Sequence, residues 1–172
     1  MNNKEFLEKI KNNEISINEG LDYLKDFNYK DLDFAKLDFQ RKERRGFGET
    51  IFCEGKEDFA LAQIYKSFSE RKESVIGTRA TPSQYERVLE LVPEAAYDPT
   101  ARIISLVYEQ TPKIGNIAIC TGGTADLKVA EEARITAEFF GAKVTKFYDV
   151  GVSGLHRLTS KIDEIAKANV II

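Results

Sequence analysis

An alternation of apolar strands and amphipathic helices over residues 116–172 constrains the fold of this chain more than any other feature. The run Ile117–Cys120 has no polar residue, which is typical of a central strand in a parallel sheet. Further strands are predicted at Val144–Tyr148 and over residues 169–172, each preceded by an amphipathic helix. Strand–helix–strand–helix–strand is half of a doubly wound sheet, so these residues predict an α/β fold.

The two helices between these strands have distinct apolar faces. Gly141 follows the first helix, at a position where a left-handed glycine commonly ends a helix. The first helix is expected to face the core with Ala130, Ala133, Ala137 and Phe140, and the solvent with Glu131, Glu132, Arg134 and Glu138. The second helix is expected to face the core with Leu155, Leu158, Ile162 and Ile165.

Residues 46–112 predict a second, smaller α/β unit in the order βαβαβ. Thr81 and Gln84 form a capping box, with Pro82 at the first helical position, where its missing N–H costs nothing. The segment Tyr97–Arg102 predicts a turn. The predicted strands are Glu49–Cys53, Val75–Gly77 and Ile103–Val107, and the other helix spans Phe59–Phe68.

Residues 1–45 predict a helical segment and a connector. Ser16 and Glu19 form a capping box at the start of the second of two short helices. The following residues are expected to be extended and end in the basic run Arg41–Arg45, which is either a solvated surface or an anion contact. The turn-rich segment Thr111–Gly115 is a candidate boundary. The expected domains are therefore residues 1–45, 46–112 and 113–172.

The composition excludes several functional classes. With 25 Lys and Arg against 28 Asp and Glu, the net charge is −3, so the chain is not expected to coat nucleic acid. A single His and two isolated Cys exclude a His-rich or CxxC metal site and suit reduced thiols. Neither a signal peptide nor an apolar run of ~18 residues is present, so we expect a cytoplasmic protein without a membrane span.

The first candidate site is the loop Thr121–Asp126, which lies between a predicted strand and a predicted helix. Gly122 and Gly123 allow the backbone to approach a ligand closely, and the helix N-terminus favours a phosphate or carboxylate. Thr121 and Thr124 add hydroxyl donors. The alternative is a tight turn in which Asp126 only caps the helix.

The second candidate site is the loop from Asp149 to His156, which follows the next predicted strand and should reach the same edge of the sheet. Gly151 and Gly154 permit unusual backbone dihedrals. His156 lies off the apolar stripe near a helix N-terminus, where a neutral imidazole able to act as acid or base is favoured. The alternative is a surface histidine beside Arg157.

Three further residues carry weaker signals. Arg79 follows a predicted strand and precedes a capped helix, so it is a candidate contact for an anion, the alternative being a surface arginine. Cys53 and Cys120 lie in or beside strands with no base nearby in the sequence, so both are interpreted as buried, inert thiols.

These segments together resemble the LarB family of nickel-pincer cofactor carboxylases, which are pyridinium-3,5-biscarboxylic acid mononucleotide synthases. The resemblance extends from Leu37 to the end of the chain. It is carried by Leu37–Arg41, Arg45–Glu49, Phe52–Lys56, Thr78–Ala80, Tyr97–Pro99, Thr121–Asp126, Val129–Ala133 and Tyr148–Arg157. The resemblance implies that the C-terminal domain is similar to aminoimidazole ribonucleotide carboxylase, a flavodoxin-like three-layer sandwich.

The activity implied by the resemblance is carboxylation of the pyridinium ring of nicotinic acid adenine dinucleotide at C5, followed by phosphoanhydride hydrolysis and release of AMP. The substrates would be the dinucleotide and CO2 or bicarbonate, with Mg²⁺ as a cofactor and no organic cofactor. By resemblance, Asp126 and His156 are catalytic groups near the reacting ring. The implied substrate-binding residues are Thr121, Gly122, Gly123, Thr124, Arg79, Asp149, Gly151 and Gly154.

In the family, addition of a cysteine thiolate to the ring makes it nucleophilic enough to attack CO2. That cysteine follows a Gly-rich loop which this chain does not reach, so the chain is expected to be an inactive N-terminal fragment with a partial flavodoxin-like sheet. Neither Cys53 nor Cys120 matches the nucleophile. Two alternatives stay open, a non-catalytic dinucleotide-binding module and a mutase of the aminoimidazole ribonucleotide carboxylase type. By analogy with that carboxylase, we expect a homo-oligomer, an octamer.

Overall fold

The computed structural model describes residues 3–25, 30–32, 35–39, 41 and 46–172. The chain forms two compact units, Met1–Glu49 and Thr50–Ile172. Of the predicted basic run, residues 42–45 lie outside the described residues, so the anion contact stays a prediction. The boundary expected near residue 112 lies inside the second unit and likewise stays a prediction. In the part of the chain that is described, no helix has the length and apolar character needed to cross a membrane.

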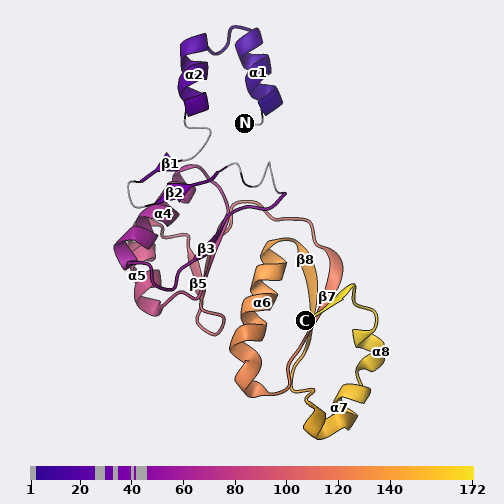
Figure 1. Ribbon diagram of the computed structural model, residues 1–172. Helices are drawn as coiled ribbons and strands as arrows, with labels where there is room; N and C mark the ends of the chain where they lie inside the picture. The colour runs from indigo at the N-terminus through magenta and orange to yellow at the C-terminus, as the bar shows by residue number, and fades with distance from the viewer. Residues whose placement is uncertain (1–2, 26–29, 33–34, 40, 42–45) are drawn as a thin grey trace. The chain divides into compact units, whose positions relative to one another are not determined.

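The first unit contains the two predicted helices (Figure 1). The predicted capping box is present: the Glu19 N–H donates to Ser16 Oγ at 3.2 Å, and the Ser16 N–H donates to Glu19 Oε2 at 2.9 Å. Within the predicted extended connector, two short strands pair in antiparallel fashion. The elements are α1 (Asn3–Lys11), α2 (Ile17–Lys25), β1 (Lys30–Asp31) and β2 (Lys36–Leu37).

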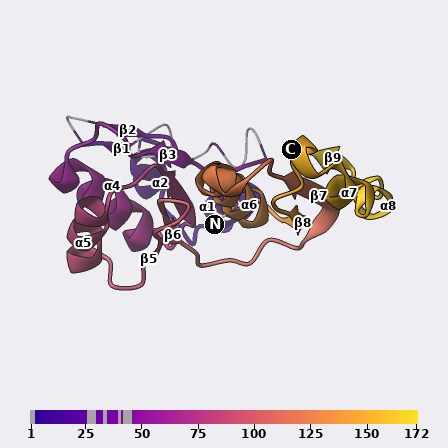
Figure 2. The same ribbon diagram turned by 90° about the horizontal axis from the view of Figure 1, so that it is seen from below.

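The second unit begins with a mixed four-stranded sheet in the order β3-β4-β6-β5. Strands β3 and β4 are parallel, whereas β6 runs antiparallel to both β4 and β5. Helices α4 and α5 pack side by side against it (Figure 2). The elements are β3 (Thr50–Phe52), α4 (Asp58–Glu70), β4 (Val75–Thr78), α5 (Pro82–Leu91), β5 (Ala96–Asp98) and β6 (Ile103–Leu106).

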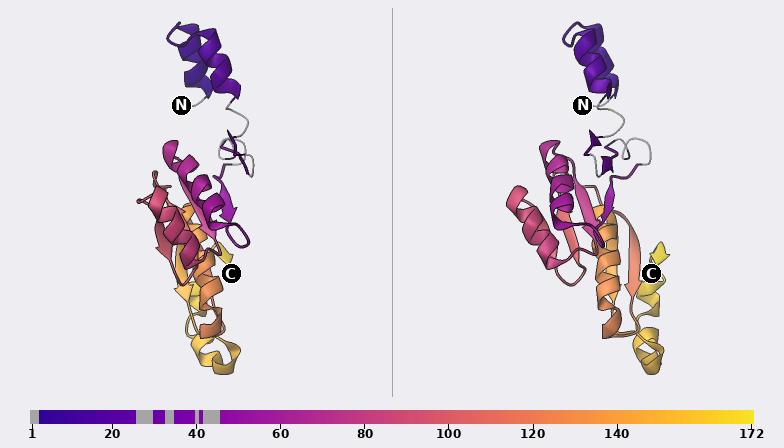
Figure 3. Two further views of the ribbon diagram at one scale, coloured as in Figure 1. Left: turned by 90° about the vertical axis from the view of Figure 1, so that its left-hand side faces the viewer. Right: turned by 60° about the vertical axis from the view of Figure 1, so that its left-hand side comes forward.

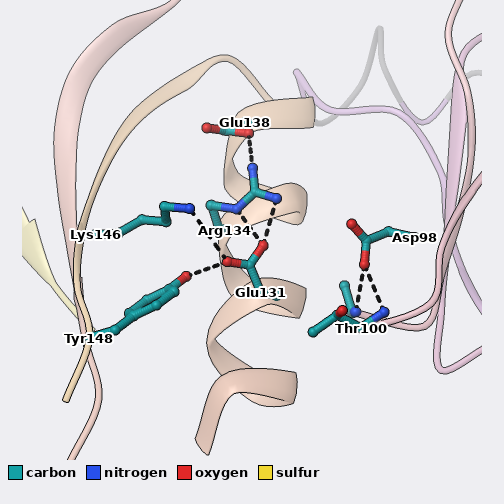
Figure 4. Close-up of polar contacts among 8 residues, drawn as sticks. Asp98, Thr100, Glu131, Arg134, Glu138, Lys146 and Tyr148 are labelled. Carbon is teal, nitrogen blue, oxygen red and sulfur yellow. Dashed lines mark hydrogen bonds and ion pairs between the residues drawn. The ribbon is translucent and has the colours of Figure 1, made fainter. Parts of the chain in front are cut away.

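Strand β5 overlaps the segment where the sequence predicted only a turn, and that prediction was wrong for Tyr97 and Asp98. Tyr97 holds this strand in place, because its ring stacks on Tyr85 at 5.1 Å and its hydroxyl donates to the Ala80 carbonyl. The turn follows one residue later. There Asp98 Oδ1 accepts from the N–H groups of Thr100 and Ala101 (Figure 4), and the chain reverses, so β6 runs antiparallel to β4.

The face of this sheet under α4 and α5 is closed by buried polar groups as well as apolar ones. The Tyr65 hydroxyl donates to the Ile104 carbonyl at 2.9 Å. Gln84, the capping-box residue of α5, is buried and donates to the Cys53 carbonyl at 2.9 Å. The predicted capping box at Thr81 is therefore present and also ties α5 to the chain after β3.

A second, three-stranded sheet follows in the order β8-β7-β9, with all strands parallel. Helix α6 lies on one face, and α7 and α8 lie on the other (Figure 3). This three-layer arrangement confirms the predicted α/β fold with a flavodoxin-like unit. The elements are β7 (Ile114–Cys120), α6 (Leu127–Phe139), β8 (Ala142–Phe147), α7 (Leu155–Thr159), α8 (Ile162–Ile165) and β9 (Val170–Ile171).

Helix α6 has neighbours on two sides, which the sequence did not predict. Besides its contacts with β7 and β8, it packs Ile135, Phe139 and Phe140 against a buried cluster of the four-stranded sheet that includes Ile76 and Ile103. Of the predicted inner face only Ala130 is buried. The remaining three residues, Ala133, Ala137 and Phe140, line an open hollow of about 420 Å³ between α6, Thr78 and Ile172.

The predicted second helix is broken into α7 and α8. Leu158 and Ile165 pack against Ala118 and Phe147 as expected of an apolar stripe. Leu155 and Ile162 are exposed, so for these two residues the prediction was wrong. The Lys161 N–H bonds to the Leu158 carbonyl, and this tight turn between the helices shifts the stripe out of register.

The Glu94 carboxylate and the hydroxyls of Ser69 and Tyr108 join the end of α4 to the loops around the four-stranded sheet. Glu94 Oε1 accepts hydrogen bonds from the hydroxyls of Tyr108 and Ser69, which lower the pKa of Glu94 from 4.5 to about 2. A folded-state pKa below the ordinary value means that the charged carboxylate stabilises the fold above pH 4.5. That contribution is lost as the pH falls from 4.5 to about 2.

We therefore expect Glu94→Gln to lower the urea midpoint at pH 7, with a difference from wild type that closes as the pH falls from 4.5 towards about 2. The measurement is urea unfolding of both proteins across this pH range. Glu86→Gln, at an exposed position of α5, serves as the control and should track the wild type at every pH. If the difference in urea midpoint between Glu94→Gln and wild type stays constant with pH, the stabilisation does not come from the lowered pKa of Glu94.

Candidate functional site

The two candidate loops leave the carboxyl ends of neighbouring parallel strands, β7 and β8, and so lie at the same edge of the sheet (Figure 1). Thr121 joins them. Its Oγ1 accepts from the Asp149 N–H at 2.9 Å, and its carbonyl accepts from the Val150 N–H at 2.9 Å. Its own N–H donates to the Phe147 carbonyl at 3.1 Å. Because Thr121 is buried, these hydrogen bonds are shielded from water, and they hold the second loop in place.

The loops also touch through their glycines. A Cβ built on Gly151 would lie 2.2 Å from the Gly122 carbonyl oxygen, and all three of its nearest neighbours are backbone atoms. Only a glycine at 151 permits this approach. The structure thus brings together Thr121, Gly122, Asp149 and Gly151, which the sequence had placed in two separate candidates.

Asp126 is exposed at the start of α6, and its Oδ2 accepts from the Gly123 N–H at 3.1 Å. The helix-capping alternative therefore describes a contact that is present. A phosphate at this loop would share or displace that hydrogen bond. Gly122 and Thr124 are exposed beside it, so the loop surface is open to a ligand.

Asp149 lies at φ +59°, a left-handed conformation that costs about 1 kcal/mol or more for a residue with a Cβ. Its carboxylate pairs with the guanidinium of Arg157, and the Arg157 side chain lies against Gly154. A Cβ on Gly154 would lie 2.6 Å from Arg157 Nε, a buried nitrogen that has no hydrogen-bond partner among the described atoms. His156, the neighbouring residue, is exposed.

Arg79 is placed elsewhere. It follows β4 at φ +53°, and its guanidinium pairs with Glu54 at 3.4 Å and lies over the Phe52 ring. These partners come from β3 and the loop after it, not from the glycine loops. The structure does not bring Arg79 into contact with Thr121 or Asp149, so its predicted role as a substrate contact stays a prediction.

Both thiols are poor nucleophiles where they lie. Cys53 is fully buried, and this burial raises the pKa of its thiol to about 12. Partial burial also raises the pKa of Cys120. A raised pKa lowers the fraction of thiolate at neutral pH. The interpretation of a buried thiol is confirmed for Cys53 and is wrong for Cys120, which is only partly buried.

The residues described here do not form a dedicated metal site. Over the described ranges, no three His, Cys, Asp or Glu side chains lie close enough together to hold a metal ion. The Mg²⁺ implied by the resemblance stays a prediction.

A network of charged and polar side chains on α6 and β8 lies beside the second loop and was missed in the sequence (Figure 4). It includes Glu131, Arg134 and Glu138, which the sequence placed in solvent and which are instead half-buried. Their spacing of three and four residues did signal ion pairs along one helix face. Their partner Tyr148 immediately follows β8, and no local pattern relates that part of the chain to the helix.

Comparison with known proteins locates one family in the chain. Residues 29–109 match the family described as LarB/PurE-like N-terminal domain. The chain is also 28% identical over 179 residues to the uncharacterized protein MJ0165 of Methanocaldococcus jannaschii, an alignment that covers 98% of this chain and 69% of that protein. The family match ends before Thr121, so the glycine loops lie outside it.

Proposed function

We propose that the protein acts in carboxylation of nicotinic acid adenine dinucleotide at C5 of its pyridinium ring. The proposal starts from the match of residues 29–109 to the family described as LarB/PurE-like N-terminal domain. The reaction forms a carbon–carbon bond between C5 and CO2 and removes the C5 proton. Hydrolysis of the phosphoanhydride then adds water and releases AMP. The product is pyridinium-3,5-biscarboxylic acid mononucleotide.

The observation that carries this proposal is the junction of the two glycine loops. Thr121 and Gly151 fix the loops against one another, so their exposed atoms form one surface at the carboxyl edge of a parallel sheet. In open α/β sheets that edge is the usual place for a nucleotide. Gly122, Gly123 and Thr124 would bind a phosphate of the dinucleotide at the start of α6.

Asp126 and His156 are the groups proposed to face the pyridinium ring. Both are exposed and stand at the ends of loops held together by Thr121. His156 is the proposed general base that removes the C5 proton. The Asp126 carboxylate would stabilise positive charge on the ring. The thiolate step of the family is assigned to neither Cys53 nor Cys120, because burial raises the pKa of both thiols.

The test is ligand selectivity. We expect nicotinic acid adenine dinucleotide to raise the melting temperature of the chain more than aminoimidazole ribonucleotide does at equal concentration, because a ligand of the native state stabilises it by mass action. Isothermal titration calorimetry with the same two ligands gives the dissociation constants. Equal shifts with both, or no shift with the dinucleotide, would contradict the proposal. A larger shift with aminoimidazole ribonucleotide would favour the mutase alternative.

A further inference from the structure

Five side chains connect α6 to the end of β8 and to Tyr148, the residue that follows it (Figure 4). Glu131 Oε1 accepts from the Tyr148 hydroxyl at 2.7 Å and lies 3.8 Å from Lys146 Nζ. Its other oxygen, Oε2, accepts from Arg134 at 2.6 and 2.7 Å. Arg134 also donates to Glu138 at 2.7 Å, so the guanidinium is held by carboxylates on both sides.

This arrangement keeps Glu131 charged and Tyr148 protonated. Burial alone would raise the pKa of Glu131, but the hydrogen bonds from Arg134 and Tyr148 and the nearby positive charges outweigh burial and lower it. Burial and the hydrogen bond to Glu131 raise the pKa of Tyr148 to about 12. At neutral pH the phenol therefore donates to a carboxylate, the stronger class of hydrogen bond. The Glu131 side chain is only 14% exposed, which limits competition from water.

Tyr148 immediately precedes Asp149, the left-handed residue that starts the second loop. The Asp149 N–H is held from the other side by Thr121 Oγ1. The Asp149 carboxylate pairs with Arg157, whose neighbour is His156. A continuous series of contacts thus runs from α6 through Tyr148 and Asp149 to α7. Loss of the Tyr148 hydroxyl would remove the contact that ties the start of the loop to α6, leaving its contacts with Thr121, Gly122 and Arg157.

We propose that the hydrogen bond between Glu131 and Tyr148 positions the loop Asp149–Gly154, so that Tyr148 and Glu131 are positioning residues for the ligand surface. Neither residue needs to touch the ligand. As an assignment to a ligand site this inference rests on the proposed function, whereas the effect on the loop is a property of the free protein. The two parts can therefore be measured separately.

The first measurement is amide hydrogen exchange of the unliganded chain with Tyr148→Phe, which removes only the hydroxyl. We expect the amides of Asp149, Val150 and Gly154 to exchange about tenfold faster, the size expected on loss of one hydrogen bond to a charged acceptor. The matched control is Tyr97→Phe. Tyr97 lies in β5 of the other sheet, and its hydroxyl is bonded to the Ala80 carbonyl, so its removal should leave the exchange rates of these amides unchanged. Unchanged exchange in Tyr148→Phe overturns the positioning role.

Two variants at Glu131 separate positioning from general damage. Glu131→Gln keeps an oxygen that can accept from Tyr148, whereas Glu131→Ala removes the acceptor. Positioning predicts that Glu131→Gln retains more loop protection than Glu131→Ala. Equal loss of loop protection in both variants would overturn the role of this hydrogen bond. Glu131 would then act only by pairing with Arg134 and stabilising α6.

The second measurement is affinity. We expect Tyr148→Phe to weaken binding of nicotinic acid adenine dinucleotide about tenfold while the melting temperature changes by only a few degrees. Undiminished affinity together with unchanged exchange overturns the inference. If the wild-type chain does not bind the dinucleotide, the proposed function fails, and the exchange rates alone then decide whether Glu131 and Tyr148 position the loop.

Discussion

Gly77→Ala is expected to destabilise the chain by about 3 kcal/mol and to lower its melting temperature by roughly 10 °C. Gly77 lies in the middle of β4, under α4. A Cβ there would lie 2.3 Å from the Tyr65 hydroxyl oxygen and 2.7 Å from Cys53 Sγ. Both neighbours are fully buried, and the Tyr65 hydroxyl is bonded to the Ile104 carbonyl. The new methyl group therefore displaces a packed ring and breaks a buried hydrogen bond.

Thermal and urea unfolding measure this effect, and a second variant identifies its cause. Tyr65→Phe removes the oxygen nearest to the new methyl group, so the double variant should lose less stability than the sum of the two single variants. Gly123→Ala is the matched control, because its extended backbone leaves nothing within 4 Å of the added Cβ. A melting temperature for Gly77→Ala within about 2 °C of wild type would contradict the close packing of Tyr65 and Cys53 against Gly77.

Gly151→Ala is expected to weaken binding of nicotinic acid adenine dinucleotide at least about tenfold, with a smaller effect on stability than Gly77→Ala. The added Cβ would lie 2.2 Å from the Gly122 carbonyl oxygen, and backbone atoms cannot rotate away as a flexible side chain can. The two loops must separate. Separation strains the hydrogen bonds from the Asp149 and Val150 amides to Thr121, which hold the proposed ligand surface together.

Calorimetric titration of the dinucleotide into wild type and variant checks this result. Val152→Ala is the matched control from the same loop, since Val152 is 81% exposed and its truncation should leave the affinity within about twofold. An unchanged dissociation constant in Gly151→Ala would contradict the prediction, because it would show that ligand binding does not depend on the contact between the two loops. The melting temperature of the variant reports on the junction even in the absence of ligand.

Local patterns in the sequence predicted much of the fold because they act over a few residues. The capping boxes at Ser16 and Thr81 form as predicted, and the apolar run at Ile117–Cys120 is the central strand of its sheet. Gly141 ends α6 at φ +88°, in the left-handed region that favours glycine. Turn chemistry, capping and strand periodicity depend on neighbours in the chain, so one sequence suffices to see them.

The candidate site was predictable only in part. The sequence identified two glycine loops after neighbouring strands, and the structure puts them in contact. It could not show that the Thr121 hydroxyl faces inward to hold Asp149, or that the Asp126 carboxylate takes the Gly123 N–H. Nor could it show that Arg79 pairs with Glu54 in the loop after β3. Each of these contacts depends on which donor and acceptor the folded backbone brings within reach.

By itself, then, the sequence determined an α/β chain with ordered helix starts and two glycine loops at one sheet edge. Only the tertiary structure decided the direction of β6, the position of α6 between two sheets and the pairing of Glu131 with Tyr148. The physical reason is sequence separation. The two partners of that last pair are 17 positions apart in the chain, and only the packing of α6 on β8 brings carboxylate and phenol within 2.7 Å.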